Sequence, residues 1–183
     1  MSKKVLVILA DGFEEIEAIA PIDILRRAGC QVTIAGLNSK AVRSSRRIQV
    51  EADVLLDEYK ETPDALVLPG GAPGSENLAK SAKVAEWVKK MNAGRKLIGA
   101  ICAAPALVLA PTGVLDGKKA TCYPGCEGKF SSSTKFSEDQ VVVDGNIVSS
   151  RGPGTAIEFG LELARQLCGK EKMEELKEKM IVK

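Results

Sequence analysis

Short apolar runs alternate along the chain with longer stretches in which apolar positions recur at helical spacing. Continuous apolar runs are typical of strands that are covered on both faces of a parallel sheet. When such strands alternate with helices, they predict right-handed crossovers and a three-layer α/β/α sandwich with a mostly parallel sheet. The predicted strands cover residues 5–10, 31–37, 64–70 and 96–102, and the predicted helices cover 14–28 and 74–92.

The second half of the chain adds elements of a different kind. KKATCY at residues 118–123 predicts a further strand, and QVVVDGNIVSS at 140–150 predicts a β-hairpin, because Asp144-Gly145 lies between two apolar runs. We expect this hairpin to add an antiparallel strand to the sheet. A late helix is expected within residues 151–169, followed by a charged surface helix within 170–182.

Length and charge set bounds on the domain organisation and the partners. A chain of 183 residues with 45% hydrophobic content is long enough for one buried core, and no linker divides it, so we expect a single domain over residues 1–183. The 26 Lys and Arg nearly balance the 24 Asp and Glu, which argues against nucleic acid and favours small molecules or other proteins. The apolar stretch at residues 5–10 is too short for a secretory signal, and no segment predicts a membrane span, so we expect a cytoplasmic protein.

Cysteine and histidine usage narrows the possible chemistry. Five cysteines lie at positions 30, 102, 122, 126 and 168 without the dense spacing of a disulfide scaffold, so free thiols are expected. The chain contains no histidine, which excludes a Cys-His or Ser-His nucleophile pair and a zinc site with histidine ligands within this subunit. Cys122 and Cys126 have no second cysteine pair to complete a metal site, so we predict no metal.

Cys102 lies where the run LIGAICAAPALVLA changes from a strand pattern to a helix pattern. A thiol on such a turn lies near free backbone N–H groups, which lower its pKa and make the thiolate available as a nucleophile. The alternative is that Cys102 is a small buried hydrophobic residue, as most free cysteines are. Its position alone does not decide between the two roles.

The end of the preceding predicted strand, LPGG, offers backbone groups that complement a thiolate. Its two glycines, Gly70 and Gly71, allow backbone N–H groups to approach a ligand closely. Together with the amides at Cys102 and Ala103, these groups form a candidate oxyanion hole.

Glu17 interrupts an otherwise apolar stripe on the first predicted helix. A carboxyl group on an inward face has either a partner or a raised pKa, and a carboxyl that titrates near neutral pH suits general acid–base catalysis. The alternative is that Glu17 reaches solvent at the edge of the stripe. Glu14 and Glu15 lie near the helix start, where we expect them to be exposed and stabilised by the helix dipole.

Two cationic regions remain without a decided role. Arg43, Arg46 and Arg47 fit a solvated loop and edge strand, whereas Arg151 opens the late helix and is available to pair with a carboxylate such as Asp23. Either region is a candidate for binding an anionic group of a substrate.

The segments VLVILADGFEEIEAIAPIDILRRAG, VLPGG, AICAAP and SRGPGTAIEF occur in this order. In order and spacing they resemble the ThiJ/PfpI superfamily, and within it the branch of the parkinsonism-associated protein deglycase, across essentially the whole chain. The resemblance implies a flavodoxin-like fold, a homodimer and an oxidation-sensitive nucleophile at Cys102. It also implies that Glu17 hydrogen-bonds this thiol, that the amides of Gly71 and Ala103 line its pocket, and that Arg46 and Arg151 lie near the pocket or the dimer interface.

The activity that the resemblance implies is a cofactor-independent glyoxalase or deglycase, which converts methylglyoxal-type 2-oxoaldehydes or their early adducts to 2-hydroxy acids. The alternative is a redox-responsive protective protein or chaperone, whose Cys102 is oxidised to a sulfinate. One departure concerns Tyr123, which stands where many relatives have a histidine before the proline of CYPGC. A phenol is a poor base near pH 7, so proton transfer is expected to depend on Glu17.

Overall fold

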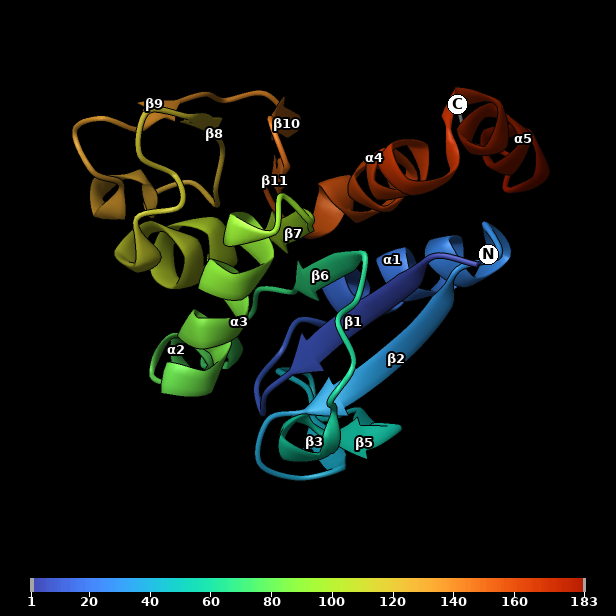
Figure 1. Cartoon of the computed structure of the whole chain (residues 1–183), viewed down its shortest axis with the longest axis horizontal. Helices are drawn as coiled ribbons and strands as arrows, with labels where there is room; N and C mark the ends of the chain where they lie inside the picture. The colour runs from blue at the N-terminus through green and yellow to red at the C-terminus, as the bar shows by residue number, and fades with distance from the viewer. Residues whose placement is uncertain (1, 183) are drawn as a thin grey trace.

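A seven-stranded sheet forms the centre of the molecule, with the strand order β10-β11-β7-β6-β1-β2-β5 (Figure 1). In this computed structural model, which describes residues 2–182, all neighbouring strands of the sheet run parallel except β10 and β11. The strands are β1 (Lys4–Leu9), β2 (Gln31–Gly36), β3 (Ala41–Arg43), β4 (Gln49–Glu51), β5 (Val54–Leu55), β6 (Ala65–Leu68), β7 (Leu97–Ile101), β8 (Lys119–Ala120), β9 (Lys135–Phe136), β10 (Val141–Asp144) and β11 (Ile147–Ser150).

Helices cover both faces of this sheet. The first and the last two helices lie on one face, and the second and third lie on the other (Figure 1). The helices are α1 (Glu15–Arg27), α2 (Gly74–Ala79), α3 (Ala82–Ala93), α4 (Ala156–Cys168) and α5 (Lys170–Lys179).

Strand β1 is buried on both sides, as its continuous apolar run predicted. Val7 and Leu9 belong to a core cluster that includes Phe159 of α4, whereas Leu6 and Ile8 belong to a second cluster with side chains of α3. Because successive side chains of a strand point to opposite faces, an uninterrupted apolar run supplies both cores at once. The predicted three-layer α/β/α sandwich is confirmed.

Apart from the two-residue edge strand β5, the parallel strands are β1, β2, β6, β7 and β11. Numbered one to five in chain order, they lie in the spatial order 2-1-3-4-5. This is the flavodoxin-like order, in which ligands bind beyond the carboxyl ends of the strands, near the point where the strand order reverses. Here that point lies between β1 and β6. Gly70 follows β6 and Cys102 follows β7, so both lie at the carboxyl edge of the sheet.

Several predicted elements differ in extent from the observed ones. The helix expected over residues 74–92 is two helices, because Ser81 interrupts it and its hydroxyl accepts a 3.4 Å hydrogen bond from the Val84 N–H at the start of α3. The chain after Cys102 enters a π-helical turn at Pro105–Leu109 rather than a regular α-helix. In KKATCY, only the two residues of β8 are a strand, and they pair with β9 outside the main sheet.

The predicted hairpin is confirmed as β10 and β11, with its turn shifted by one residue. Asp144 pairs with Ile147, so the two turn residues are Gly145 and Asn146 rather than Asp144-Gly145. Gly145 adopts a φ of +61°, which a turn of this kind favours and which glycine adopts without strain.

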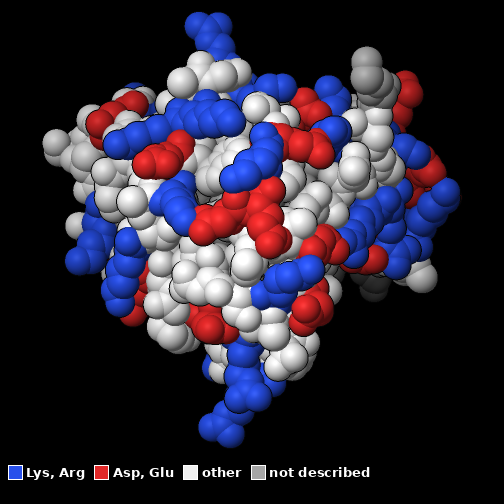
Figure 2. All heavy atoms as spheres, turned by 60° about the horizontal axis from the view of Figure 1, so that its bottom comes forward, with Lys and Arg blue, Asp and Glu red and all other residues white. Residues whose placement is uncertain are grey.

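Both signs of charge are interspersed on the face that Figure 2 displays. None of the helices in residues 2–182 combines the length and apolar character that a membrane span requires.

Candidate active site

Cys102 lies on a strained turn directly after β7. Its φ of +65° is in the left-handed region, which non-glycine residues rarely adopt. Two backbone hydrogen bonds hold the turn: the Cys102 N–H donates to the Ser150 carbonyl at 2.9 Å, and the Tyr123 N–H donates to the Cys102 carbonyl at 2.8 Å. Strain that the surrounding structure maintains in this way is a feature of functional sites.

Glu17 of α1 points into the molecule and is fully buried. Its Oε2 accepts a 3.0 Å hydrogen bond from the Gly70 N–H, whereas Oε1 has no hydrogen-bond partner among the described residues. A β-carbon placed on Gly152 would lie 4.0 Å from Oε1, so this oxygen faces a position that has no side chain. The expectation of an inward carboxyl is therefore correct, and the solvent-exposed alternative is wrong.

Burial raises the pKa of Glu17 to about 7, against the lowering effects of Cys102 and of the Gly70 N–H. The negative charge of Glu14 adds to the increase. A carboxyl group with this pKa is present in both protonation states near neutral pH, which is the property that general acid–base catalysis requires.

The pKa of the Cys102 thiol is raised by burial and by the neighbouring Glu17, and lowered by the backbone N–H groups of Gly71 and Ala103. The expectation of a lowered pKa is therefore wrong, because burial has the largest effect and the neighbouring Glu17 adds to the increase. Protonation of Glu17 removes the repulsion between the two groups, whereas the cost of burying a thiolate remains. Two negative charges in this pair are therefore unfavourable.

The two glycines after β6 have different roles, although the sequence analysis assigned both to the same candidate oxyanion hole. The Gly70 N–H binds the Glu17 carboxylate, and only the Gly71 N–H acts together with Ala103 on the Cys102 sulfur. Gly71 adopts a φ of +100°, and a β-carbon there would lie 2.4 Å from the Glu14 nitrogen, so no larger residue fits this turn.

The side chain of Tyr123 is about half exposed. Its ring packs on Gly152, where a β-carbon would lie 3.2 Å from the ring, and Gly152 is also the residue that Glu17 Oε1 faces. The Tyr123 ring and Glu17 Oε1 therefore both lie beside Gly152.

Among the described residues, neither Arg46 nor Arg151 forms a hydrogen bond with Glu17 or Cys102. The Arg151 guanidinium donates to the Glu138 carbonyl at 3.1 Å rather than to Asp23, and Asp23 instead pairs with Arg27 on the next turn of α1 at 2.7 Å. The suggested pairing of Arg151 with Asp23 is therefore wrong, because local partners satisfy both groups. The side chain of Arg46 is exposed, and its backbone N–H donates to Glu15 at 2.8 Å.

Glu15 is buried, although its place in the first turn of α1 predicted exposure. Its carboxylate accepts hydrogen bonds from the hydroxyls of Ser44 and Ser45 and from the Arg46 N–H. These bonds lower its pKa against the effect of burial, so Glu15 is an anion that anchors the loop between β3 and β4. The serine pair before Arg46 was the only sequence signal for this contact.

Cys122 is fully buried and Cys126 half-buried, and burial raises the pKa of Cys122 to about 12. Within residues 2–182, no group of three or more Cys, Asp or Glu side chains is arranged to hold a metal ion.

A model of the DJ-1/PfpI family matches residues 3–166. The chain belongs to this family. It is 46% identical to dj-1beta of Drosophila melanogaster over 100% of this chain and 98% of that protein. The crystal structure of Drosophila melanogaster DJ-1beta superposes with a TM-score of 0.96 at 45% identity, covering 100% of both chains, which confirms the flavodoxin-like fold.

Two further relatives differ in length and name. DJ-1 homolog B of Arabidopsis thaliana is 48% identical over 92% of this chain, which spans only 39% of that longer protein. A Caenorhabditis elegans relative, named glutathione-independent glyoxalase DJR-1.2, is 36% identical over 95% of this chain and 94% of its own length. The family resemblance expected from the four sequence segments is confirmed.

The raised pKa of Glu17 predicts a pH-dependent stability. Because the folded chain binds this proton more tightly than the unfolded chain, whose Glu pKa is near 4.5, the free energy of unfolding should fall as pH rises through 5 to 8, by about 3 kcal/mol. Urea unfolding of Cys102→Ala, which removes the coupled thiol, measures this slope. Adding Glu17→Gln should flatten it, and an equal slope in both variants would contradict the assignment.

Proposed function

We propose that this protein is a cofactor-independent glyoxalase or deglycase that acts on methylglyoxal-type 2-oxoaldehydes or on their early adducts. The observation that carries the proposal is the burial of Glu17 beside the Cys102 thiol, which raises the carboxyl pKa to about 7 and couples it to the nucleophile. The name of the Caenorhabditis elegans relative supports the same class of reaction.

In the proposed reaction, Glu17 takes the proton of the Cys102 thiol, and the thiolate adds to the aldehyde carbon. Protonated Glu17 then gives this proton to the new alkoxide oxygen, which leaves a hemithioacetal and an ionised Glu17. Ionised Glu17 then removes the proton from that carbon, and the resulting enediolate oxygen is held by the Gly71 and Ala103 N–H groups. Return of the proton to the neighbouring carbon gives a 2-hydroxyacyl thioester. Water cleaves the thioester, releasing the 2-hydroxy acid and the free thiol.

The test is turnover of methylglyoxal by the purified chain without added thiol, metal or nucleotide. Lactate should form in large molar excess over protein, and Cys102→Ser should abolish its formation. Cys126→Ser is a matched control, because this thiol is more exposed than Cys102 but lies outside the Glu17 site, and it should leave turnover unchanged. Consumption of only one equivalent of aldehyde would overturn the proposal.

A second candidate function is a redox-responsive protective protein, in which Cys102 is oxidised to a sulfinate. It is favoured by the same two N–H groups, since Gly71 and Ala103 would stabilise sulfinate oxygens as they stabilise a thiolate. Peroxide would then add two oxygen atoms at Cys102 in a protein that shows no methylglyoxal turnover.

We also propose that the protein is a homodimer. Ile16 and Ile19 of α1 and Ile157 of α4 are 53%, 42% and 40% exposed and line an apolar depression of about 500 Å³. In a twofold-symmetric dimer formed by this surface, these side chains would be buried in both subunits. Ile16→Asp should therefore give a monomer at concentrations where light scattering detects a dimer of the parent. Val143→Asp, at a similarly exposed position on β10, should remain dimeric; a dimeric Ile16→Asp would contradict this interface.

Two further proposals concern the cellular compartment and the number of domains. We place the protein in a reducing compartment such as the cytoplasm, since all five cysteines are free. We also treat residues 1–183 as one domain, because both core clusters pack on the same sheet.

A further inference from the structure

Two cysteines far apart in the sequence meet at the opposite end of the sheet from Cys102. The sulfur atoms of Cys30 and Cys168 are 3.6 Å apart, although the two residues are 138 positions apart in the sequence. Cys30 is buried in the turn between α1 and β2, and half-buried Cys168 is the last residue of α4. Neither takes part in the proposed reaction.

Close packing of α1 against α4 brings the two sulfurs together. A β-carbon on Gly160 of α4 would lie 2.7 Å from Ile24 of α1, so this glycine lets the helices approach closely. The Cys30 N–H donates to the Leu25 carbonyl at 3.0 Å, which fixes the turn after α1. Gly169 ends α4 directly after the second cysteine. Both thiols are therefore held in contact by ordered backbone.

We propose that Cys30 and Cys168 form a second redox site, a dithiol that a hydroperoxide converts reversibly to an intramolecular disulfide. A disulfide bond of about 2.05 Å requires the sulfurs to approach by about 1.5 Å from their contact distance of 3.6 Å. The site differs in chemistry from Cys102, which has no cysteine partner and would be oxidised alone.

The reaction balances with one peroxide for two thiols. Cys168, the more exposed sulfur, attacks a peroxide oxygen, becomes a sulfenic acid and releases one water. The Cys30 sulfur then attacks the Cys168 sulfur, the S–O bond breaks, and the leaving hydroxide takes the Cys30 proton as a second water. Peroxide is reduced by two electrons, and the two thiols are oxidised to one disulfide. An added thiol such as dithiothreitol reverses the change.

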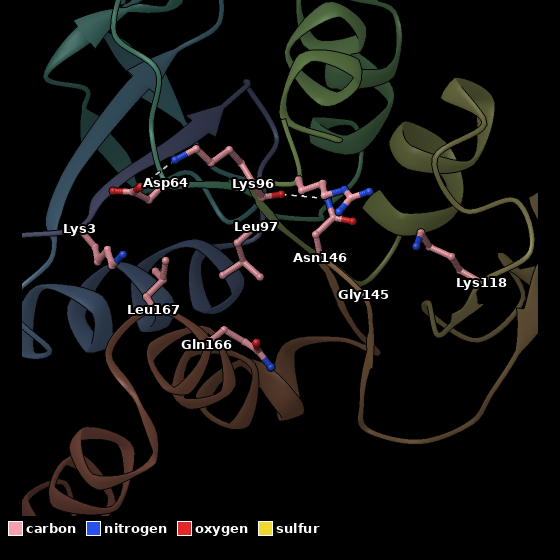
Figure 3. Close-up of a pocket in the computed structure, with 10 residues that line it drawn as sticks. Lys3, Asp64, Lys96, Leu97, Lys118, Gly145, Asn146, Gln166 and Leu167 are labelled. Carbon is pink, nitrogen blue, oxygen red and sulfur yellow. Dashed lines mark hydrogen bonds and ion pairs between the residues drawn. The ribbon is translucent and has the colours of Figure 1, made fainter. Parts of the chain in front are cut away.

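A cavity of about 630 Å³ lies at the amino-terminal edge of the sheet, the edge at which Cys30 precedes β2 (Figure 3). Leu167, which directly precedes Cys168, lines the cavity, and so do Lys3 and Asp64, whose charges act on Cys30. Figure 3 shows these three residues on the same side of the opening. Burial and contact with Cys168 raise the pKa of Cys30 to about 12, which suits the resolving rather than the attacking role.

A bond between these positions links the start of β2 to the end of α4. Because it closes a loop of most of the chain, it removes many conformations from the unfolded state. We therefore expect the oxidised protein to unfold at a temperature several degrees above that of the reduced protein.

The experiment treats full-length Cys102→Ser with stoichiometric hydrogen peroxide, so that the proposed nucleophile does not consume the oxidant. Intact mass should fall by two hydrogen atoms, a non-reducing peptide map should contain the Cys30–Cys168 cross-link, and dithiothreitol should reverse both changes. Adding Cys30→Ser or Cys168→Ser should abolish the mass loss and the thermal shift. Adding Cys122→Ser, at a buried thiol outside the pair, should abolish neither.

Three results would overturn the proposal. They are full alkylation of both cysteines after oxidation, a cross-link between two chains instead of within one, and independent oxidation of Cys168 to a sulfinate while Cys30 stays reduced. Because the readouts are mass and thermal unfolding of a variant without the proposed nucleophile, they do not depend on glyoxalase activity.

Discussion

Glu17→Gln should lower kcat/KM for methylglyoxal by about 10²- to 10⁴-fold, the range that general acid–base catalysis contributes. The amide side chain keeps the size of the carboxyl and can still accept the hydrogen bond that the Gly70 N–H donates at 3.0 Å in the parent. It cannot remove or return a proton. The loss should therefore be chemical rather than structural, and the pH profile should lack the ionisation near pH 7 that the raised pKa of Glu17 predicts for the parent.

Steady-state assays from pH 5 to 9 measure this effect, with the thermal unfolding temperature as a check on folding. Glu15→Gln is the matched control, because Glu15 is a buried carboxylate two positions earlier on α1 that binds Ser44 and Ser45 instead of facing the thiol. It should keep most of the activity under conditions in which it is folded. A Glu17→Gln enzyme within tenfold of the parent would remove Glu17 from the reaction.

Gly70→Ala should lower activity by about 10²-fold or more, although it adds only one methyl group. The new β-carbon would lie 2.4 Å from Glu17 Oε2 and 2.6 Å from the Cys102 β-carbon, so the carboxyl and the thiol must move apart. Neither neighbour yields easily, since Glu17 is fully buried and the Cys102 turn is held on both sides. We also expect a loss of about 1–3 kcal/mol in stability from overpacking.

The matched control is Gly154→Ala, because a β-carbon on Gly154 would meet no atom within 4 Å although Gly154 is only two residues from Gly152, which Glu17 Oε1 faces. Methylglyoxal kinetics and urea unfolding of both variants separate the loss of geometry from the loss of folding. Gly70→Ala with parental kinetics would mean that the distance between the carboxyl and the thiol is unimportant for turnover.

The architecture was predictable because a strand that is buried on both faces of a sheet requires a continuous run of apolar residues, which is visible in the sequence. The strand runs at residues 5–10 and 96–102 were identified within one or two residues, since each position in them faces a core. The predicted helix boundaries were less accurate where a single polar residue determines them. Ser81, for example, lies between α2 and α3 and caps the start of α3. The hairpin was found from its turn, but its register depended on pairing between strands.

The reactive thiol and carboxyl were also visible in the sequence. Cys102 stands at the change from strand to helix pattern, and Glu17 interrupts an apolar stripe, so both break a local rule that the rest of the chain follows. Places where local rules fail are expected to be functional or strained, and Cys102 has a strained φ of +65°.

The amino-acid sequence by itself determined the layers, the sheet and the residues available for chemistry, because these depend on local periodicity and residue type. Only the tertiary structure decided that Gly70 binds Glu17 and not the thiol, that Glu15 is buried, and that Cys30 meets Cys168. It also decided that the charge of Glu17 opposes ionisation of Cys102. Electrostatic coupling and contacts between side chains depend on distances between segments that are far apart in the chain. The local sequence pattern does not specify those distances.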